Sequence, residues 1–465
     1  MKKVIVFLLT VAIAVGSLGF AHATVSESQD DLVIYPTAEV GDAAVLEGMT
    51  ASMTFACGDH LRWYTDYPFG GEAVTEFEYN AEGIEEVSEV SYGYLNIWFT
   101  GGVGSSTSGT FSLTNTGYGA LLRAVAAVTP DGSSKTMNLR MADYVDYYMP
   151  DYDLYYTGEE GYCSQSASLH GLMTGDSWYE ERGAYTHLMQ KFRFPVQEDH
   201  IMSVTVDKND AGGVNGIDLT SENGPELNFI SDVSDEGIWF VPIFLDEDGA
   251  PLPYESPEGH GIYHIPWKID SSVTYGSGKQ GLTLDMNKVT RLAALDETIP
   301  ILHMVIDAET GEAWMLTLED GSYILTAWDL TSGEALVRTE VLPQDPACEY
   351  TDAWFVEDNG YLLITTQGSV ALVEKATGEL LLTAPDVTGQ TYSAANYDEM
   401  GDLRFDGETL VLLDTGSYRH GAFWTCAFRQ DELVYYGLYD CSIMRGNDDW
   451  YYSYISTEQD VVVLK

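Results

Sequence analysis

Three short fragments of this sequence repeat one order of residues: an acid, two spacers, Ser or Thr, Gly and Glu. They are DAETGE (307–312), DLTSGE (329–334) and EKATGE (374–379). The last two stand at the same place in longer units, 313–342 and 353–387, which both run strand, acidic Gly turn, strand, Ser/Thr-Gly-Glu turn, strand. A unit of this size cannot bury both of its faces alone. The repetition therefore predicts several small sheets packed against one another.

Short runs rich in β-branched and aromatic residues occur along the whole chain, and helical periodicity is almost absent. The clearest runs are YLNIWFT (94–100), GIWFVPIFL (237–245), SYILTAW (322–328), YLLITTQ (361–367), TLVLLDT (409–415) and ELVYYGL (432–438). Asp, Asn and Gly between them tolerate the positive φ of tight hairpins. The sequence predicts an all-β fold.

The two longer units resemble blades of a quinoprotein-like or WD-repeat β-propeller, and the resemblance is clear over residues 300–440. It implies a ring over residues 49–465 of about seven blades, with six or eight left open by the blade length. The last strand, DVVVLK (460–465), is expected to pair with the first blade and close the ring. Tandem β-sandwiches are the alternative. The chain lacks the docking motif and paired cysteines of quinone-dependent relatives, so the resemblance implies no cofactor.

The first 23 residues have the form of a bacterial-type export signal. Lys2 and Lys3 precede an apolar run from Val4 to Val15, and a small-x-small site ends at Ala23. The apolar run is shorter than the roughly 20 residues that span a bilayer. We expect cleavage after Ala23, a secreted protein without membrane insertion, and an acidic, partly disordered lead-in over residues 24–48.

The charge of the chain limits its partners. Removing Lys2 and Lys3 changes the formal charge from −52 to −54. Such a surface repels phosphate backbones, which excludes nucleic acid and leaves an extracellular protein or glycan as the expected partner. Five cysteines are too few for a disulfide framework, although Cys426 and Cys441 could pair across neighbouring strands.

The stretch VDKNDAGGVNGIDL (206–219) is similar to a dockerin-type calcium loop. Asp207, Asn209, Asn215 and Asp218 fall at loop positions 1, 3, 9 and 12. Position 5 is Ala211, so one ligand is missing, and the following residues do not predict the helix that a dockerin has. The loop is a candidate calcium site or an ordinary Asn/Asp/Gly hairpin, and a dockerin function is not inferred.

The stretch 143–162 interleaves tyrosines with carboxylates, a combination that suits sugar rings. Tyr147, Tyr152 and Tyr155 are therefore candidate glycan contacts, although tyrosine is also a common strand residue.

No catalytic motif is present. His260 and His264 are four apart, but Pro253, Pro257 and Pro266 indicate extended chain, in which residues four apart lie too far from each other to share a metal. The sequence predicts a secreted, non-catalytic propeller that binds protein or glycan. The alternative is an extracellular carbohydrate-active enzyme that uses Asp and Glu in a central channel, with catalytic residues that the sequence does not identify.

Overall fold

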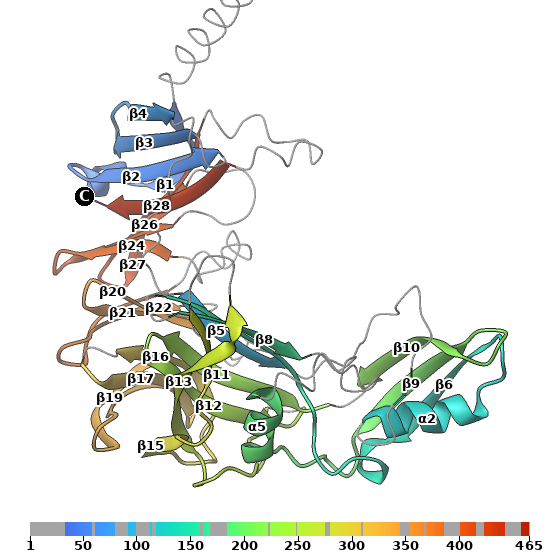
Figure 1. Cartoon of the computed structure of the whole chain (residues 1–465). Coiled ribbons are helices and arrows are strands. Elements are labelled where there is room, and N and C mark those ends of the chain that lie inside the picture. The colour runs from blue at the N-terminus through green and yellow to red at the C-terminus, as the bar shows by residue number, and fades with distance from the viewer. Residues whose placement is uncertain are drawn as a thin grey trace, which may run out of the picture. The chain divides into compact units, whose positions relative to one another are not determined.

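The computed structural model describes residues 33–57, 61–79, 92–98, 112–113, 118–158, 161–167, 184–221, 224–247, 249–274, 280–307, 310–344, 354–366, 369–385, 400–414, 423–441 and 457–464. The expected signal peptide lies outside these residues. The chain divides into two compact units, Met1–Val87 with Asp345–Lys465 and Ser88–Gln344, and this division falls inside the range 49–465 assigned to one propeller. Figure 1 traces the elements of both units.

The first unit contains three antiparallel sheets in which sequence neighbours pair. One has the strands β20 (Trp354–Asp358), β21 (Tyr361–Thr366), β22 (Ser369–Glu374) and β23 (Glu379–Pro385). The next has β24 (Met400–Phe405), β25 (Thr409–Asp414), β26 (Phe423–Arg429) and β27 (Glu432–Cys441), and the third has β28 (Thr457–Leu464), β2 (Thr50–Cys57), β3 (Leu61–Pro68) and β4 (Val74–Tyr79). Four-stranded meanders of this kind are the blades that the repeats predicted.

Hydrophobic clusters fill the space between successive blades. Leu372 and Leu382 pack with Leu412 and Trp424 between the first two sheets, and Trp63 packs with Val411 and Phe423 between the second and the third. Val411 belongs to one cluster and its neighbour Leu412 to the other, so this blade is buried on both faces between two others.

The terminal strand β28 pairs with β2 in antiparallel register, so the predicted pairing of the C-terminus with the first blade is confirmed. The expected lead-in is partly structured: Ile34–Gly41 forms strand β1, which adds a fifth strand beside β27. Tyr435 donates a hydrogen bond to Glu39 at 2.9 Å. The apolar positions in this segment are too few to have predicted a strand, which is instead stabilised by pairing with β27.

The repeated turns have one geometry. Gly311, Gly333 and Gly378 have φ of 70°, 72° and 70°, and the N–H of each donates to the carbonyl four residues back, at 2.8, 2.7 and 2.8 Å. The turns join β16 (Ile301–Asp307) to β17 (Glu312–Glu319), β18 (Ser322–Asp329) to β19 (Glu334–Pro343), and β22 to β23. Strands β16 to β19 form a fourth blade, which belongs to the second unit.

The rest of the second unit departs from the blade pattern. Seven strands follow the order β11 (Glu226–Ser234), β12 (Gly237–Leu245), β13 (Gly261–Thr274), β14 (Gln280–Leu284), β8 (Tyr162–Ala167), β7 (Asp151–Thr157) and β5 (Tyr92–Trp98), and β15 (Thr290–Ala294) also pairs with β13. The sheet curls until β5 contacts β11, where Ser231 donates to the Leu95 carbonyl at 2.9 Å. The fold class, all-β and propeller-like, is confirmed, with this nearly closed sheet as an irregular element.

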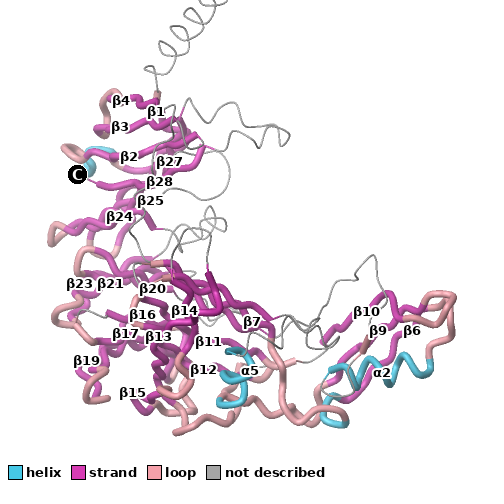
Figure 2. The backbone as a smooth tube through the Cα atoms, viewed as in Figure 1, coloured by secondary structure: helices cyan, strands magenta, loops and turns pink. Residues whose placement is uncertain are grey.

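Two α-helices within the described residues were not predicted from the sequence (Figure 2). Helix α2 (Tyr118–Val128) buries Leu121, Leu122 and Val125 against a three-stranded sheet of β6 (Ser134–Arg140), β9 (Ile201–Lys208) and β10 (Val214–Ser221). Helix α5 (Ala184–Lys191) is about two turns long, with eight residues. Of the helices described, neither has the length and apolar character needed to cross a membrane.

Cys426 and Cys441, whose pairing the sequence left possible, lie on neighbouring strands and are buried, but the register does not place them opposite each other. Cys426 lies opposite Tyr436, and Cys441 lies opposite Ile34.

Candidate functional site

A pocket of about 70 Å³ lies in the second unit. It is bounded by the end of β12, by the loop that leads into β13, and by the segment between β15 and β16. Its apolar wall includes Pro242, Phe244, Pro251, Leu252, Pro300 and Ile301. The remaining surface is polar, and a concave site that combines apolar walls with polar groups is a usual form of ligand site.

The walls of the pocket are fixed before any ligand arrives. Leu252 donates its backbone N–H to the Phe244 carbonyl at 2.7 Å, and Asp246 donates to the Ala250 carbonyl at 2.9 Å. Pro251 forms an isolated antiparallel β-bridge with Leu245, and its ring restricts the backbone angle φ of this residue. The loop therefore contributes a rigid surface, which lowers the entropy cost of binding.

Tyr254 and His260 are the polar pair of the pocket. The Tyr254 hydroxyl and His260 Nδ1 lie 2.7 Å apart, and the backbone N–H of Gly261 donates to the same hydroxyl oxygen. The hydroxyl oxygen has a second lone pair, so either Tyr254 or His260 Nδ1 can be the donor of their hydrogen bond.

Burial sets the charge of this pair. Burial raises the pKa of Tyr254, which keeps the phenol protonated. Burial also lowers the pKa of His260, against the opposite influence of Glu297 and Asp296, so the imidazole is neutral near pH 7. Its Nε2 is buried and has no hydrogen-bond partner within the described residues. A buried polar atom in this state costs about 1–3 kcal/mol of stability.

The rim of the pocket is acidic. Glu297 lines it and is exposed, and Asp296 precedes it. The backbone N–H and hydroxyl of Thr298 donate to Asp296 Oδ1 at 2.9 and 2.7 Å and lower the pKa of that carboxyl. Fixed negative charge at the rim disfavours an anionic ligand.

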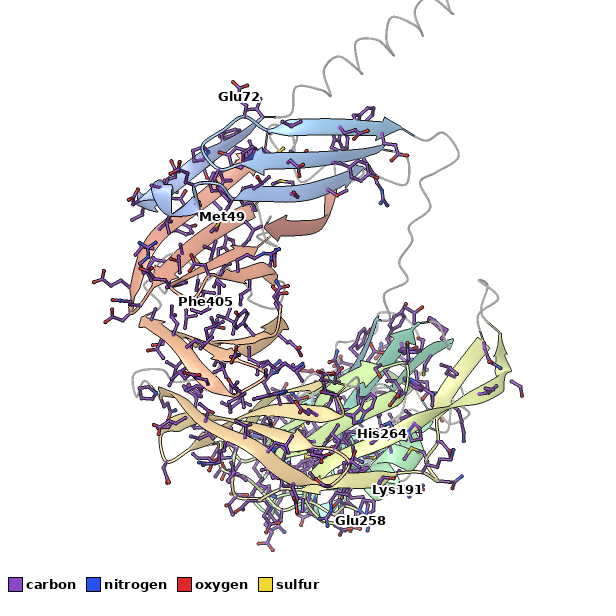
Figure 3. The ribbon with its side chains drawn as sticks, turned by 90° about the vertical axis from the view of Figure 1, so that its left-hand side faces the viewer. Met49, Glu72, Lys191, Glu258, His264 and Phe405 are labelled. Atoms are coloured by element: carbon purple, nitrogen blue, oxygen red, sulfur yellow. The ribbon has the colours of Figure 1, made fainter. Side chains whose placement is uncertain are left out.

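His264, four residues after His260 in the sequence, is not among the residues that line the pocket. His264, in β13, stacks on Trp239 with the ring centres 4.6 Å apart and hydrogen-bonds to the Glu236 backbone. Figure 3 shows His264 in this strand, with Glu258 in the loop before it. Within the described ranges, no three His, Cys, Asp or Glu side chains gather as a metal site.

The candidate calcium residues lie on the β9–β10 hairpin. The register places Asp207 opposite Gly216 and Asp218 opposite Thr205, and Asn215 occupies the register shift between Val214 and Gly216. Val214 begins strand β10, which runs through the second half of the loop, whereas a dockerin loop is followed by a helix. The geometry is that of a β-hairpin with a bulge.

The hairpin turn uses one of the proposed ligands itself. Asn209 Oδ1 accepts hydrogen bonds from the backbone N–H groups of Ala211 and Gly213, at 3.0 and 2.9 Å. This oxygen is already engaged in an Asx-type turn. Asp207 and Asp218 remain as candidate ligands, and calcium binding at the hairpin stays a prediction.

The candidate glycan-binding tyrosines are separated. Tyr147 donates to Glu255 Oε1 at 2.8 Å, while the Arg193 guanidinium lies 4.7 Å from its ring centre and pairs with Glu255. Tyr155, in β7, stacks on Tyr94 with the centroids 5.7 Å apart. Tyr152 also lies in β7, but its side chain is outside the described residues. A glycan role for these tyrosines stays a prediction.

A second polar chain was not anticipated from the sequence. Tyr148 OH lies 2.8 Å from His200 Nδ1, and His200 Nε2 lies 2.7 Å from Ser221 Oγ. The order resembles that of a nucleophile, a base and an orienting group. However, burial lowers the pKa of His200 to about 4, which makes the imidazole a weak base near neutral pH. The chain is better suited to joining β10 to the loop before β7.

One carboxyl of a close pair, Asp358, has the raised pKa that is common in catalytic sites. Burial raises the pKa of Asp358 to about 6, helped by its hydrogen bond to Asp402. The two carboxyls are in direct contact, whereas glycosidases hold theirs about 5 to 10 Å apart. Leu403 also donates its backbone N–H to Asp358 Oδ2 at 2.7 Å, so the pair joins two blades.

The sequence analysis noted His260 but missed Tyr254 and Glu297 as its partners. The signal was the pair of prolines at positions 251 and 253, which both line the pocket. Pro253 was interpreted only as evidence against a helix, and Pro251 was not considered.

Comparison with known proteins gives only distant structural likenesses. No protein family model and no curated protein matches the chain. A putative 6-phosphogluconolactonase from Bacteroides fragilis is similar over 84% of this chain and 98% of its own, with 9% identity and a TM-score of 0.26.

Two further structures give values in the same range. The WD40 domain of SCAP from fission yeast has 9% identity over 87% of this chain and 74% of its own, with a TM-score of 0.19. A protein from Lactobacillus plantarum has 11% identity over 71% of this chain and 97% of its own, with a TM-score of 0.20. The blade topology described above, and not these scores, carries the description of the fold.

Proposed function

We propose that this protein is an exported, non-catalytic binding module that holds an extracellular glycan or protein through the pocket at Tyr254 and His260. The observation that carries the proposal is the pocket itself, in which Tyr254, His260 and Glu297 stand beside apolar side chains and the walls are held by backbone hydrogen bonds. A concave site with a few polar groups among apolar side chains is the common form of a binding site.

Export is proposed from residues 1–23 alone. Expression of the full chain in a bacterial host, followed by fractionation and N-terminal sequencing, tests it. Mature protein outside the cytoplasm that begins at Thr24 is expected. Retention of Met1 in a cytoplasmic product contradicts export.

The binding role is tested on residues 24–465 with a glycan array and with thermal shift against neutral ligands. The variant Ile299→Phe, which adds volume to the pocket wall, is expected to abolish binding, while Leu336→Phe, at a 52% exposed position outside the pocket, retains it. Equal binding by both variants, with both folded by circular dichroism, would exclude the pocket.

Incubation of the bound ligands with the protein separates a binding function from a catalytic one. The alternative function is a carbohydrate-active enzyme with Asp and Glu in a central channel. The carboxyl pair Asp358 and Asp402 is engaged with the backbone and with Asn359, which favours a structural role for it. Ligands recovered unchanged after long incubation are expected, and release of reducing sugar would support the enzyme.

Calcium is proposed only as a structural ion at the 207–218 hairpin. Thermal melts of the wild type in calcium and in chelator test it, with Asp207→Ala as the variant that removes a ligand. An identical melting temperature in calcium and chelator eliminates the ion.

A further inference from the structure

The pocket beside β12 differs in charge between its interior and its rim. Because burial raises the pKa of Tyr254 and lowers the pKa of His260, both interior groups are uncharged near pH 7. The rim carries the carboxylates of Glu297, which lines the pocket, and of its neighbour Asp296, and both residues are exposed. Resting on the proposed binding function, we propose that the pocket holds an aliphatic side chain of a partner protein, beside a lysine or arginine that pairs with the rim.

The apolar part of the wall is open to a ligand. Leu245, Leu252 and Ile299 line the pocket, and each of these residues is partly exposed. The backbone hydrogen bond from Leu252 to Phe244, at 2.7 Å, holds this part of the wall in place, so little ordering is needed when a side chain enters. An aliphatic group in contact with these residues removes apolar surface of both partners from water, which stabilises the complex.

The size of the pocket limits the anchor that it accepts. Its volume of about 70 Å³ holds roughly five groups of the size of a water molecule. A leucine or isoleucine side chain is of that size, whereas the rings of tyrosine and tryptophan are larger. An aliphatic side chain seated in a pocket is a known form of anchor in protein interfaces.

The charge at the rim selects the residue beside the anchor. The backbone N–H and hydroxyl of Thr298 donate to the Asp296 carboxylate and lower its pKa, so this negative charge persists well below neutral pH. The charge of Glu297 acts on the interior as well, since it raises the pKa of both Tyr254 and His260. A basic residue of the partner is attracted to these carboxylates, and an acidic one is repelled.

One cation partly opposes the two carboxylates. Arg291 Nη1 lies 3.4 Å from the His260 carbonyl oxygen, and Arg291 is not among the lining residues. Two carboxylates and one guanidinium leave one negative charge in excess, on a chain whose formal net charge is −52. The field around the pocket therefore favours a basic partner surface.

The same wall is less suited to a glycan. Sugar rings commonly stack on an exposed aromatic face, but Phe244 is only 2% exposed. The Tyr254 ring contacts the rings of Phe194 and His260. Sugar hydroxyls also need several hydrogen-bond partners, whereas Tyr254 and His260 already bond to each other. These features favour a protein over a glycan, and a preference for a glycan is one outcome of the test.

The test uses capped glycine peptides that contain one leucine followed by one lysine, with the chain from residue 24 to residue 465. Ligand-observed NMR measures the dissociation constants, which one small anchor places in about the millimolar range. Replacing the leucine of the peptide by alanine should weaken binding about tenfold, because the buried side chain is lost. Replacing the lysine by glutamate should weaken it about three- to tenfold, and less at high salt. Equal binding of the three peptides overturns the inference.

A charge reversal in the protein assigns the effect to the rim. Glu297→Lys is expected to invert the preference, so that the glutamate peptide binds more tightly than the lysine peptide. Glu72→Lys is the matched control: it makes the same change in net charge at an exposed position of the first unit and should keep the wild-type preference. If both variants are folded by circular dichroism and both keep that preference, the rim does not select the partner and the inference fails.

The outcomes separate this inference from the proposed function. If a neutral sugar binds and Ile299→Phe abolishes its binding, while no peptide binds, the inference fails and the binding function stands. If neither sugars nor peptides depend on the pocket, both fail.

Discussion

Asn359 Nδ2 donates a hydrogen bond to Asp402 Oδ1 at 3.0 Å, from the turn between β20 and β21 to the first strand of the next blade. The same nitrogen donates to the Leu403 carbonyl at 3.0 Å. Asn359 has φ of 50°, the left-handed conformation that a two-residue hairpin turn needs and that Asn tolerates. The turn thus both reverses the chain and joins two blades.

This junction is expected to make the stability of the first unit depend on pH. Burial raises the pKa of Asp358 to about 6 from an ordinary value of 3.8. Between these values the folded state holds the proton and the unfolded state does not, so the contribution is complete below pH 3.8 and is lost as the pH rises through 6. Asp358→Asn, which mimics the protonated form, should be at least as stable as the wild type at pH 7. Urea unfolding between pH 4 and 7.5 measures this.

Asp406 is the matched control with the opposite sign. The backbone N–H groups of Thr409 and Glu408 lower the pKa of its carboxyl. Its contribution is present above the unfolded pKa and is lost as the pH falls through the lower folded value. Asp406→Asn should therefore reduce stability at pH 7 and have less effect at low pH. If both Asn variants change stability in the same direction at pH 7, the explanation is wrong.

The blades could be predicted because their information is local. The turns that contain Gly333 and Gly378 carry their own signal, a side-chain oxygen that accepts a hydrogen bond from the backbone and a glycine with positive φ. The nearly closed sheet could not be predicted in this way. In this sheet β14 pairs with β8 and Gly281 lies opposite Tyr162, which is far away in the sequence. The pattern of apolar residues along a strand does not predict which distant strand it pairs with.

The pocket was hidden for a similar reason. Tyr254 and His260 are close in sequence, but Glu297 reaches the same pocket only because β15 and the segment after it lie beside β13. Helix α2 was missed although YGALLRAVAAV is rich in alanine and leucine, which favour a helix, and carries apolar residues at helical spacing. The structure decides for a helix by burying Leu121, Leu122 and Val125 on one face.

The chain of Tyr148, His200 and Ser221 is expected to stabilise the fold without acting as a nucleophile. His200→Phe leaves Ser221 Oγ without the contact at 2.7 Å and should cost about 1–3 kcal/mol, while Ser221→Ala removes the smaller partner and should cost less. Because burial lowers the pKa of His200 to about 4, a serine-reactive phosphonate should not label Ser221. Labelling that Ser221→Ala abolishes would reverse this conclusion.

The turn glycines provide a final test, which separates backbone strain from a steric contact. Gly321 and Gly333 have φ of 80° and 72°, so alanine at either position adopts an unfavourable conformation that costs about 1–2 kcal/mol. A Cβ at Gly321 meets no atom within 4 Å, whereas a Cβ at Gly333 lies 2.6 Å from the Leu292 carbonyl oxygen in β15. Gly333→Ala should therefore lose roughly 1–3 kcal/mol more than Gly321→Ala, the usual cost of overpacking. Urea unfolding of the two variants measures the difference, and equal losses would mean that the turn after β18 does not pack on β15.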